Sequence, residues 1–175
     1  MAGRINKYSL WLVPEGRAGE ALQALVSAVA AETDTPPFVP HLTLVAHLSA
    51  SAQTLPELKQ RIATLAGLLH PIQLEFIDFG SLDEKSRSLF IEVRREPLRA
   101  VYQTAATVFP VVRDEHFAAL PHISVLYGLH PEGVKRRLIQ GHALPVGTAA
   151  VSALSLFLTE GTPSTWRLEQ SFPLS

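Results

Sequence analysis

Two short segments of the chain carry the same set of residues that can do chemistry. Residues 40–43 read Pro-His-Leu-Thr and residues 121–124 read Pro-His-Ile-Ser, so the two histidines lie 81 positions apart (122 − 41). In each segment a proline precedes the histidine, and a hydroxyl residue follows two positions after it. A single histidine on a strand is more often a hydrogen-bonded core residue than a catalyst. The prediction of a site therefore depends on the pair.

Strand geometry predicts where these side chains point. Side chains at positions i and i+2 of a strand lie on the same face, so His41 projects with Thr43, and His122 projects with Ser124. The aliphatic residues between and after them point the other way, into a core. Burying four such polar groups without partners would cost about 1–3 kcal/mol each. Both polar faces are therefore expected on one shared, solvated groove.

The four side chains suit acid–base chemistry at phosphorus. Imidazole has an unperturbed pKa of about 6.5, so one neutral and one protonated histidine can act as base and acid. Each role typically contributes about 10²–10⁴-fold to the rate. The hydroxyls of Thr43 and Ser124 can donate to the non-bridging phosphate oxygens. This scheme needs no cofactor and no metal, and no further histidine or carboxylate has convincing ligand spacing.

Composition limits the classes of protein that the chain can belong to. It has 175 residues, of which 47% are hydrophobic and 18% charged, enough for a single domain over residues 1–175, built as two lobes. The net charge of −1 argues against binding to long nucleic acid. A small anionic ligand remains compatible with it, because such a ligand needs only one local binding site. The absence of cysteine excludes disulfides and thiolate sites. With no signal peptide and no apolar run of about 18 residues, we expect a cytoplasmic protein without membrane contact. A monomer is the default expectation.

Periodicity and breakers predict an α+β fold with antiparallel sheets. Apolar alternation predicts strands at residues 8–13, 41–48, 72–79, 86–93, 122–127, 151–159 and 166–172, and helical spacing predicts helices around 21–29, 54–69, 97–108 and 131–139. Hairpins dominate this order, which disfavours a doubly wound parallel sheet. Thr54 and Glu57 predict a capping box at the second helix. The basic run at residues 135–137 is expected on a solvated helix face. Gly80 is expected to mark the end of a strand.

The paired strands resemble those of the two-histidine (2H) phosphoesterase superfamily. Residues 8–14 (YSLWLVP) and 121–128 (PHISVLYG) look like the cyclic phosphodiesterase branch known from plants and yeast. The resemblance implies a bilobal fold, two antiparallel sheets with outer helices related by a pseudo-twofold around a central groove. It implies His41 and His122 as catalytic residues and Thr43 and Ser124 as phosphate ligands. It also places two aromatic residues at the groove: Trp11 and Tyr127.

The resemblance implies a small cyclic phosphate as the binding partner. In that branch, nucleoside 2′,3′-cyclic phosphates open to 2′-phosphates, and ADP-ribose 1″,2″-cyclic phosphate opens to ADP-ribose 1″-phosphate. By analogy, His122 is the base that activates water and His41 is the acid. An enzyme acting on RNA ends, like RNA ligase T-type phosphodiesterases, is an alternative, which the net charge mildly disfavours. A further alternative is a module that binds a nucleotide without catalysis. The presence of two matched histidines disfavours it, because binding alone would not need two groups that transfer protons.

Some residues keep two interpretations. Trp11 lies in an apolar strand and can serve core packing or ligand contact. Tyr127 has odd spacing from His122, so it reaches the groove only if the strand bends or ends at Gly128. The remaining histidines are expected at strand ends, beside loops or in solvent: His47, His70, His116, His130 and His142.

Overall fold

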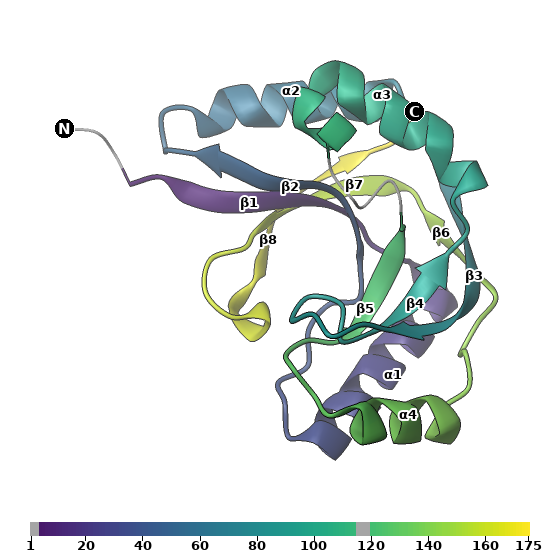
Figure 1. The fold of residues 1–175 in the computed structure, drawn as a ribbon. Coiled ribbons are helices and arrows are strands. Elements are labelled where there is room, and N and C mark those ends of the chain that lie inside the picture. Colours follow the sequence, from purple (N-terminus) through teal and green to yellow (C-terminus); the bar gives the residue numbers. More distant parts are fainter. Residues whose placement is uncertain (1–3, 115–119) are drawn as a thin grey trace.

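Eight strands form one strongly curled antiparallel sheet in the computed structural model, which describes residues 4–114 and 120–175 (Figure 1). Their order across the sheet is β6-β3-β4-β5-β2-β1-β7-β8. The strands are β1 (Asn6–Leu12), β2 (Leu42–Ala50), β3 (Ile72–Ser81), β4 (Leu89–Val93), β5 (His122–Leu126), β6 (Thr148–Val151), β7 (Ala153–Leu158) and β8 (Arg167–Pro173).

The two strands that carry the histidine segments are neighbours at the centre of the sheet. β2 and β5 meet at one residue pair, Leu42 with Ile123, and this pair divides the sheet into two halves of four strands each. The predicted α+β class with antiparallel pairing is confirmed. The two predicted sheets are joined through this central pair, so each lobe is one half of a continuous curled sheet.

Four α-helices of the described residues lie on the outside of the curl: α1 (Gly16–Thr33), α2 (Leu55–Gly67), α3 (Arg99–Val108) and α4 (Glu132–Gly141). α2 and α3 lie together over the half that contains β1 and β2, whereas α1 packs on β5 and β6 of the other half. α4 is tied to α1 where His142 lies 2.7 Å from Glu32. Within the described ranges, no helix is long and apolar enough to cross a lipid bilayer.

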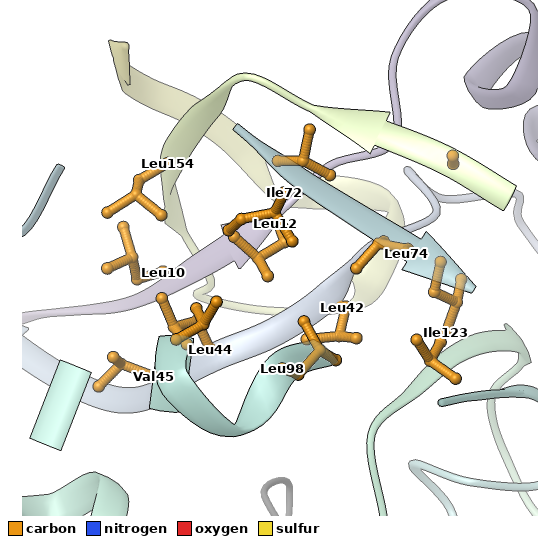
Figure 2. Packing of buried hydrophobic residues seen from close by; sticks show 14 of the residues in the cluster. Leu10, Leu12, Leu42, Leu44, Val45, Ile72, Leu74, Leu98, Ile123 and Leu154 are labelled. Atoms are coloured by element: carbon orange, nitrogen blue, oxygen red, sulfur yellow. The ribbon is translucent and has the colours of Figure 1, made fainter. Parts of the chain in front are cut away.

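The core lies between the sheet and these helices. Leu10, Leu12, Leu42, Leu44 and Ile123 have no exposed surface, and Figure 2 shows them packed in one cluster. They alternate along β1, β2 and β5 with the residues of the opposite face, as the period of two predicts. Each buried aliphatic side chain of this kind contributes about 1.5–3 kcal/mol. This packing holds the polar face of the central strands in a fixed position.

The apolar run at residues 151–159, predicted to form one strand, is divided between two. Thr148–Val151 forms β6, which pairs with β3, and Ala153–Leu158 forms β7, which pairs with β1 and β8. At the crossing, the Glu15 carboxylate accepts hydrogen bonds from the amide and the hydroxyl of Ser152 (3.2 and 2.9 Å). The chain therefore passes from one half to the other within a single apolar run.

The capping box predicted at Thr54 does not form. The Thr54 hydroxyl instead accepts the amide of Ser51 at 2.9 Å, which closes the turn before α2. Glu57 remains in the first turn of the helix, where a negative charge favours the helix dipole.

The prediction of a solvated basic run is wrong for Lys135. Its side chain is buried, and its Nζ donates to the Leu82 carbonyl at 3.1 Å and lies 3.1 Å from a Glu132 carboxylate oxygen. Arg136 and Arg137 are exposed, as predicted.

Candidate active site

The two histidines are anchored in the same way. Nδ1 of His41 lies 2.7 Å from the Val39 carbonyl, and Nδ1 of His122 lies 2.8 Å from the Leu120 carbonyl. Because a carbonyl can only accept, Nδ1 carries the proton in both rings. Nε2 is then the nitrogen whose protonation can change.

The shared proline explains this anchoring. The accepting carbonyl in each segment belongs to the residue before proline, which is restricted to extended backbone. Proline itself has no amide proton to pair, so the strand ladder loses no donor at this position. The Pro-His order therefore presents the carbonyl two residues back to the histidine ring, once at Pro40 and once at Pro121.

The polar face of the central strands lines a cavity of about 450 Å³. All six residues predicted from the sequence line it together: Trp11, His41, Thr43, His122, Ser124 and Tyr127. The remaining lining residues were missed by the sequence reasoning: Lys7, Tyr8, Ser9, Ala46, His47, Ser86, Thr159 and Trp166. The two histidine segments therefore share one cavity.

Burial sets the proton affinity of His41. Its ring stacks on Trp11 with centroids 3.4 Å apart and planes 8° from parallel, and only 5% of the residue is exposed. Burial lowers the pKa of His41 to about 4, with a further lowering from His122, while the hydrogen bond to Val39 acts in the opposite direction. His41 is therefore neutral near pH 7.

His122 is packed differently, against an aromatic edge. The ring of Phe90 on the neighbouring strand β4 lies 5.4 Å from it at 63°. Phe90 in turn covers Gly80 of β3, where an added Cβ would come within 2.5 Å of the phenyl ring. Gly80 thus does more than end a strand, because it leaves the space that Phe90 occupies.

The two hydroxyls are not equivalent. The Ser124 hydroxyl donates to the Ser86 carbonyl at 2.9 Å, in the turn between β3 and β4. The Thr43 hydroxyl has no hydrogen-bond partner among residues 4–114 and 120–175, whereas its own carbonyl accepts the Tyr102 hydroxyl at 3.2 Å. Thr43 can therefore donate to a ligand at once, and Ser124 must first turn from Ser86.

Tyr127 reaches the cavity because β5 ends at Leu126. The next residue, Gly128, has a φ of 99°, which favours glycine, and its amide donates to the Lys85 carbonyl at 2.7 Å. Burial raises the pKa of Tyr127 to about 12, and a hydrogen bond with Ser124 acts against that rise. The phenol is therefore protonated near pH 7.

Trp166 is the main aromatic residue that sequence reasoning missed as a site residue. It follows a short helical turn (Pro163–Thr165) after β7, and its ring lies edge-on to Trp11 at 5.5 Å and to Tyr127 at 5.7 Å. Its indole nitrogen is buried and finds no acceptor in the described part of the chain. The sequence placed Trp166 at the start of the last strand, which begins one residue later at Arg167.

Of the other described histidines, His47 lines the cavity, whereas His70, His130 and His142 do not. His70 bonds the Ser175 carbonyl, His130 bonds the Tyr127 carbonyl, and His142 meets Glu32. His116 falls outside the described residues. No group of three or more histidine, aspartate or glutamate side chains within the described ranges is arranged to hold a metal ion.

A curled antiparallel sheet with a histidine–hydroxyl dyad at each central strand defines the chain as a protein of the two-histidine phosphoesterase class. Residues 38–163 match the 2′-5′ RNA ligase superfamily, and the chain belongs to this family. The resemblance seen in the sequence is thereby confirmed at the level of the superfamily.

Solved structures agree with the fold. TT0787 of Thermus thermophilus superposes with a TM-score of 0.65 at 17% identity, over 96% of this chain and 97% of that one. Escherichia coli LigT in complex with 3′-AMP gives 0.59 at 17% identity, over 97% and 98%. No curated protein matches the chain by sequence.

Proposed function

We propose that this protein is a 2′,3′-cyclic-nucleotide phosphodiesterase that opens small cyclic phosphates without a metal ion or cofactor. The observation that carries the proposal is the shared cavity, in which two histidines, each anchored through Nδ1, lie with the hydroxyl residues Thr43 and Ser124. In this proposal residues 1–175 act as one bilobal domain and a monomer. The substrates are nucleoside 2′,3′-cyclic phosphates and ADP-ribose 1″,2″-cyclic phosphate.

The proposed reaction is an in-line displacement at phosphorus. A water oxygen attacks the phosphorus while one histidine removes a proton from that water. The bond from phosphorus to O3′ breaks, and the second histidine gives its proton to O3′. The product is the 2′-phosphate, and proton exchange with solvent restores the two rings.

The low pKa of His41 favours the base role for this residue. A ring with a pKa of about 4 is neutral near pH 7, so Nε2 of His41 carries no proton and can accept one. This reverses the assignment made by analogy from the sequence, in which His122 was the base. His122, the other histidine of the shared cavity, takes the acid role in this proposal.

The hydroxyls and aromatic rings supply binding in this proposal. Thr43 donates to a non-bridging phosphate oxygen, and Ser124 joins it after turning from Ser86. Trp11 and Tyr127 contact the sugar and base. The crystal structures of E. coli LigT hold 3′-AMP and NADP⁺, and we carry a nucleotide ligand over to this chain as part of the proposal.

An RNA end is the second candidate substrate, and the family description, 2′-5′ RNA ligase, favours it. The cavity favours a small ligand, because Lys7 is the only lysine or arginine that lines it among the described residues. A strand of RNA would need several such cations along its path.

The decisive experiment follows 2′,3′-cyclic AMP by phosphorus NMR with the purified protein in excess chelator. We expect ring opening to the 2′-phosphate, and a loss of about 10²–10⁴-fold in kcat for His41→Asn and for His122→Asn. His70→Asn is the control, because His70 lies apart from the cavity.

Each outcome that contradicts the proposed function points to a different alternative. Binding without ring opening would identify a nucleotide-binding module. Activity that vanishes in chelator would refute the metal-independent mechanism. A cyclic-ended oligonucleotide turned over far faster than cyclic AMP would establish the RNA-end function instead.

A further inference from the structure

The cavity extends beyond the two dyads along β1. Trp11, Ser9 and Lys7 alternate along this strand, and all three line the cavity. Lys7 lies four positions before Trp11, about 13 Å away at the usual rise of a strand. The Trp11 ring stacks on His41, so the cavity reaches well past the position of a single cyclic phosphate.

A bulged segment of β2 forms the facing wall. The register of β1 on β2 shifts twice, between Leu10 and Trp11 and between Tyr8 and Leu10. As a result, Ala46 and His47 of β2 together face Ser9, and both line the cavity. His47 has a left-handed backbone (φ 58°), a conformation that residues with a Cβ rarely adopt, and such backbone clusters at functional sites.

The polar groups at this end are donors without an acidic partner. Lys7 donates to the Ser49 hydroxyl at 3.1 Å and forms no ion pair among the described residues. The hydroxyls of Ser9 and Thr159 lie 3.4 Å apart. None of the residues that line the cavity in the described part of the chain is an aspartate or glutamate. Glu160, which directly follows Thr159 in the sequence, is paired with Arg4.

We propose that Lys7, Ser9, His47 and Thr159 form a second anion subsite, which binds a phosphate attached to the 5′ side of the nucleoside that carries the cyclic phosphate. The subsite rests on the proposed function and narrows its substrate class to molecules with a second phosphate. Two kinds of molecule carry a phosphate on the 5′ side of the sugar that bears the cyclic phosphate. In an ADP-ribose cyclic phosphate it is part of the pyrophosphate, and at an RNA end it is a phosphodiester.

Equilibrium binding of two product analogues tests the subsite without catalysis. Isothermal titration calorimetry compares 2′-AMP with adenosine 2′,5′-bisphosphate, which differ only in the 5′-phosphate. We expect the bisphosphate to bind the native protein about three- to tenfold more tightly, as one charge-assisted contact allows. Lys7→Met should reduce this ratio of affinities to nearly one, and His47→Gln should reduce it in part.

Arg17→Met is the matched control, because Arg17 is an exposed cation at the start of α1 that does not line the cavity. It should leave the affinity ratio unchanged. A ratio near one in the native protein, or a ratio that Lys7→Met does not alter, would overturn the subsite.

Turnover separates the subsite from the proposed function and identifies the source of the phosphate. Ring opening of cyclic AMP with no preference for a 5′-phosphate would refute the subsite alone. A bisphosphate preference without any ring opening would refute the proposed function alone. The source of the second phosphate is identified by comparing kcat/KM for ADP-ribose 1″,2″-cyclic phosphate and for a cyclic-ended dinucleotide. The natural substrate class is the one for which Lys7→Met lowers kcat/KM more. If Lys7→Met lowers kcat/KM for neither substrate, the subsite is contradicted.

Discussion

Trp11 lies face to face with His41, and this contact has two consequences at the scale of single residues. The stack, 3.4 Å between ring centroids, keeps water from one face of the imidazole, and it fixes the plane in which Nε2 lies. Phe157 also stacks on Trp11 at 4.1 Å, so the indole cannot move freely. The proton affinity of His41 therefore depends on a neighbour that carries no charge.

Replacing Trp11 should change the pH dependence of the reaction. Trp11→Leu admits water to His41, so its pKa should rise from about 4 toward the ordinary 6.5. If His41 is the base, the acidic limb of the kcat/KM profile should move to higher pH, and an NMR titration of the His41 ring should show the same shift. Trp166→Leu is the control, because that ring lies 6.2 Å from His41 and edge-on. An unchanged His41 titration in Trp11→Leu would contradict this account.

His41 should also make the fold sensitive to acid. Between about pH 6.5 and pH 4 the unfolded chain carries a proton on this ring and the folded chain does not, so the free energy of unfolding falls as the pH falls. From pH 7 to pH 5 the loss attributable to His41 is about 2 kcal/mol. Urea unfolding of the native protein and of His41→Gln at both pH values measures it. Equal pH dependence in the two proteins would show that His41 does not titrate in this way.

The sequence was sufficient to predict residues whose roles follow from strand periodicity. His41, Thr43, His122 and Ser124 lie on one face because side chains alternate, and the structure places them in one cavity. Lys7 was missed because the first strand was predicted to begin at residue 8, whereas β1 begins at Asn6. His47 was missed because the register shifts between β1 and β2 place it with Ala46 opposite Ser9, and no residue pattern marks those shifts. Trp166 was missed because it enters the cavity from a connection between strands.

At the scale of secondary structure elements, the β3–β4 hairpin supports His122 through Gly80 and Phe90. Gly80→Ala would bring a methyl group within 2.5 Å of the phenyl ring, which must then shift. We expect a loss of about 1–3 kcal/mol in stability and a several-fold fall in kcat, because the Phe90 ring packs on His122. Denaturation curves and steady-state kinetics measure the two effects.

Gly133→Ala supplies the comparison for Gly80. Gly133 lies in α4, and the position that a Cβ would take there is surrounded by open space, so alanine should stabilise the helix by up to about 1 kcal/mol. If Gly80→Ala behaved like Gly133→Ala, Phe90 would not need the space above Gly80.

The turn between β3 and β4 is held in place by helix α4. Lys135 donates to the Leu82 carbonyl, and the same turn offers the Ser86 carbonyl to Ser124 and the Lys85 carbonyl to Gly128. Lys135→Met removes the bond to Leu82 and should raise KM several-fold more than it lowers kcat, because Ser124 is the proposed phosphate ligand. Stability should fall by about 1–3 kcal/mol.

The neighbouring Arg136→Met tests whether the effect belongs to Lys135. Arg136 is exposed on the same helix, so its replacement should alter neither KM nor stability beyond about 0.5 kcal/mol. A destabilised Lys135→Met with native KM and kcat would make Lys135 a structural residue only. The sequence could not reveal this role, since one lysine of a basic run looks like the others until the fold buries it.

At the scale of the whole molecule, the chain crosses repeatedly between the two halves of the sheet. β1 lies in one half, α1 packs on the other, and β2 returns to the first. The division of residues 148–158 into β6 and β7 adds a further crossing. The buried cluster draws on strands of both halves (Figure 2). The halves therefore share one core, although only one residue pair joins β2 to β5.

This shared core predicts that the halves unfold together. Both tryptophans, Trp11 and Trp166, lie in or beside strands of the β1 half, whereas far-ultraviolet circular dichroism reports both halves. Leu74→Ala, a fully buried site on β3 in the other half, should cost about 2–5 kcal/mol. In urea it should shift the tryptophan fluorescence and circular dichroism transitions to the same midpoint, because the β1 half has no separate core to keep it folded. If Leu74→Ala left the fluorescence midpoint at its native value while the circular dichroism transition split, the two halves would be independent folding units, and the central cavity would depend on their docking.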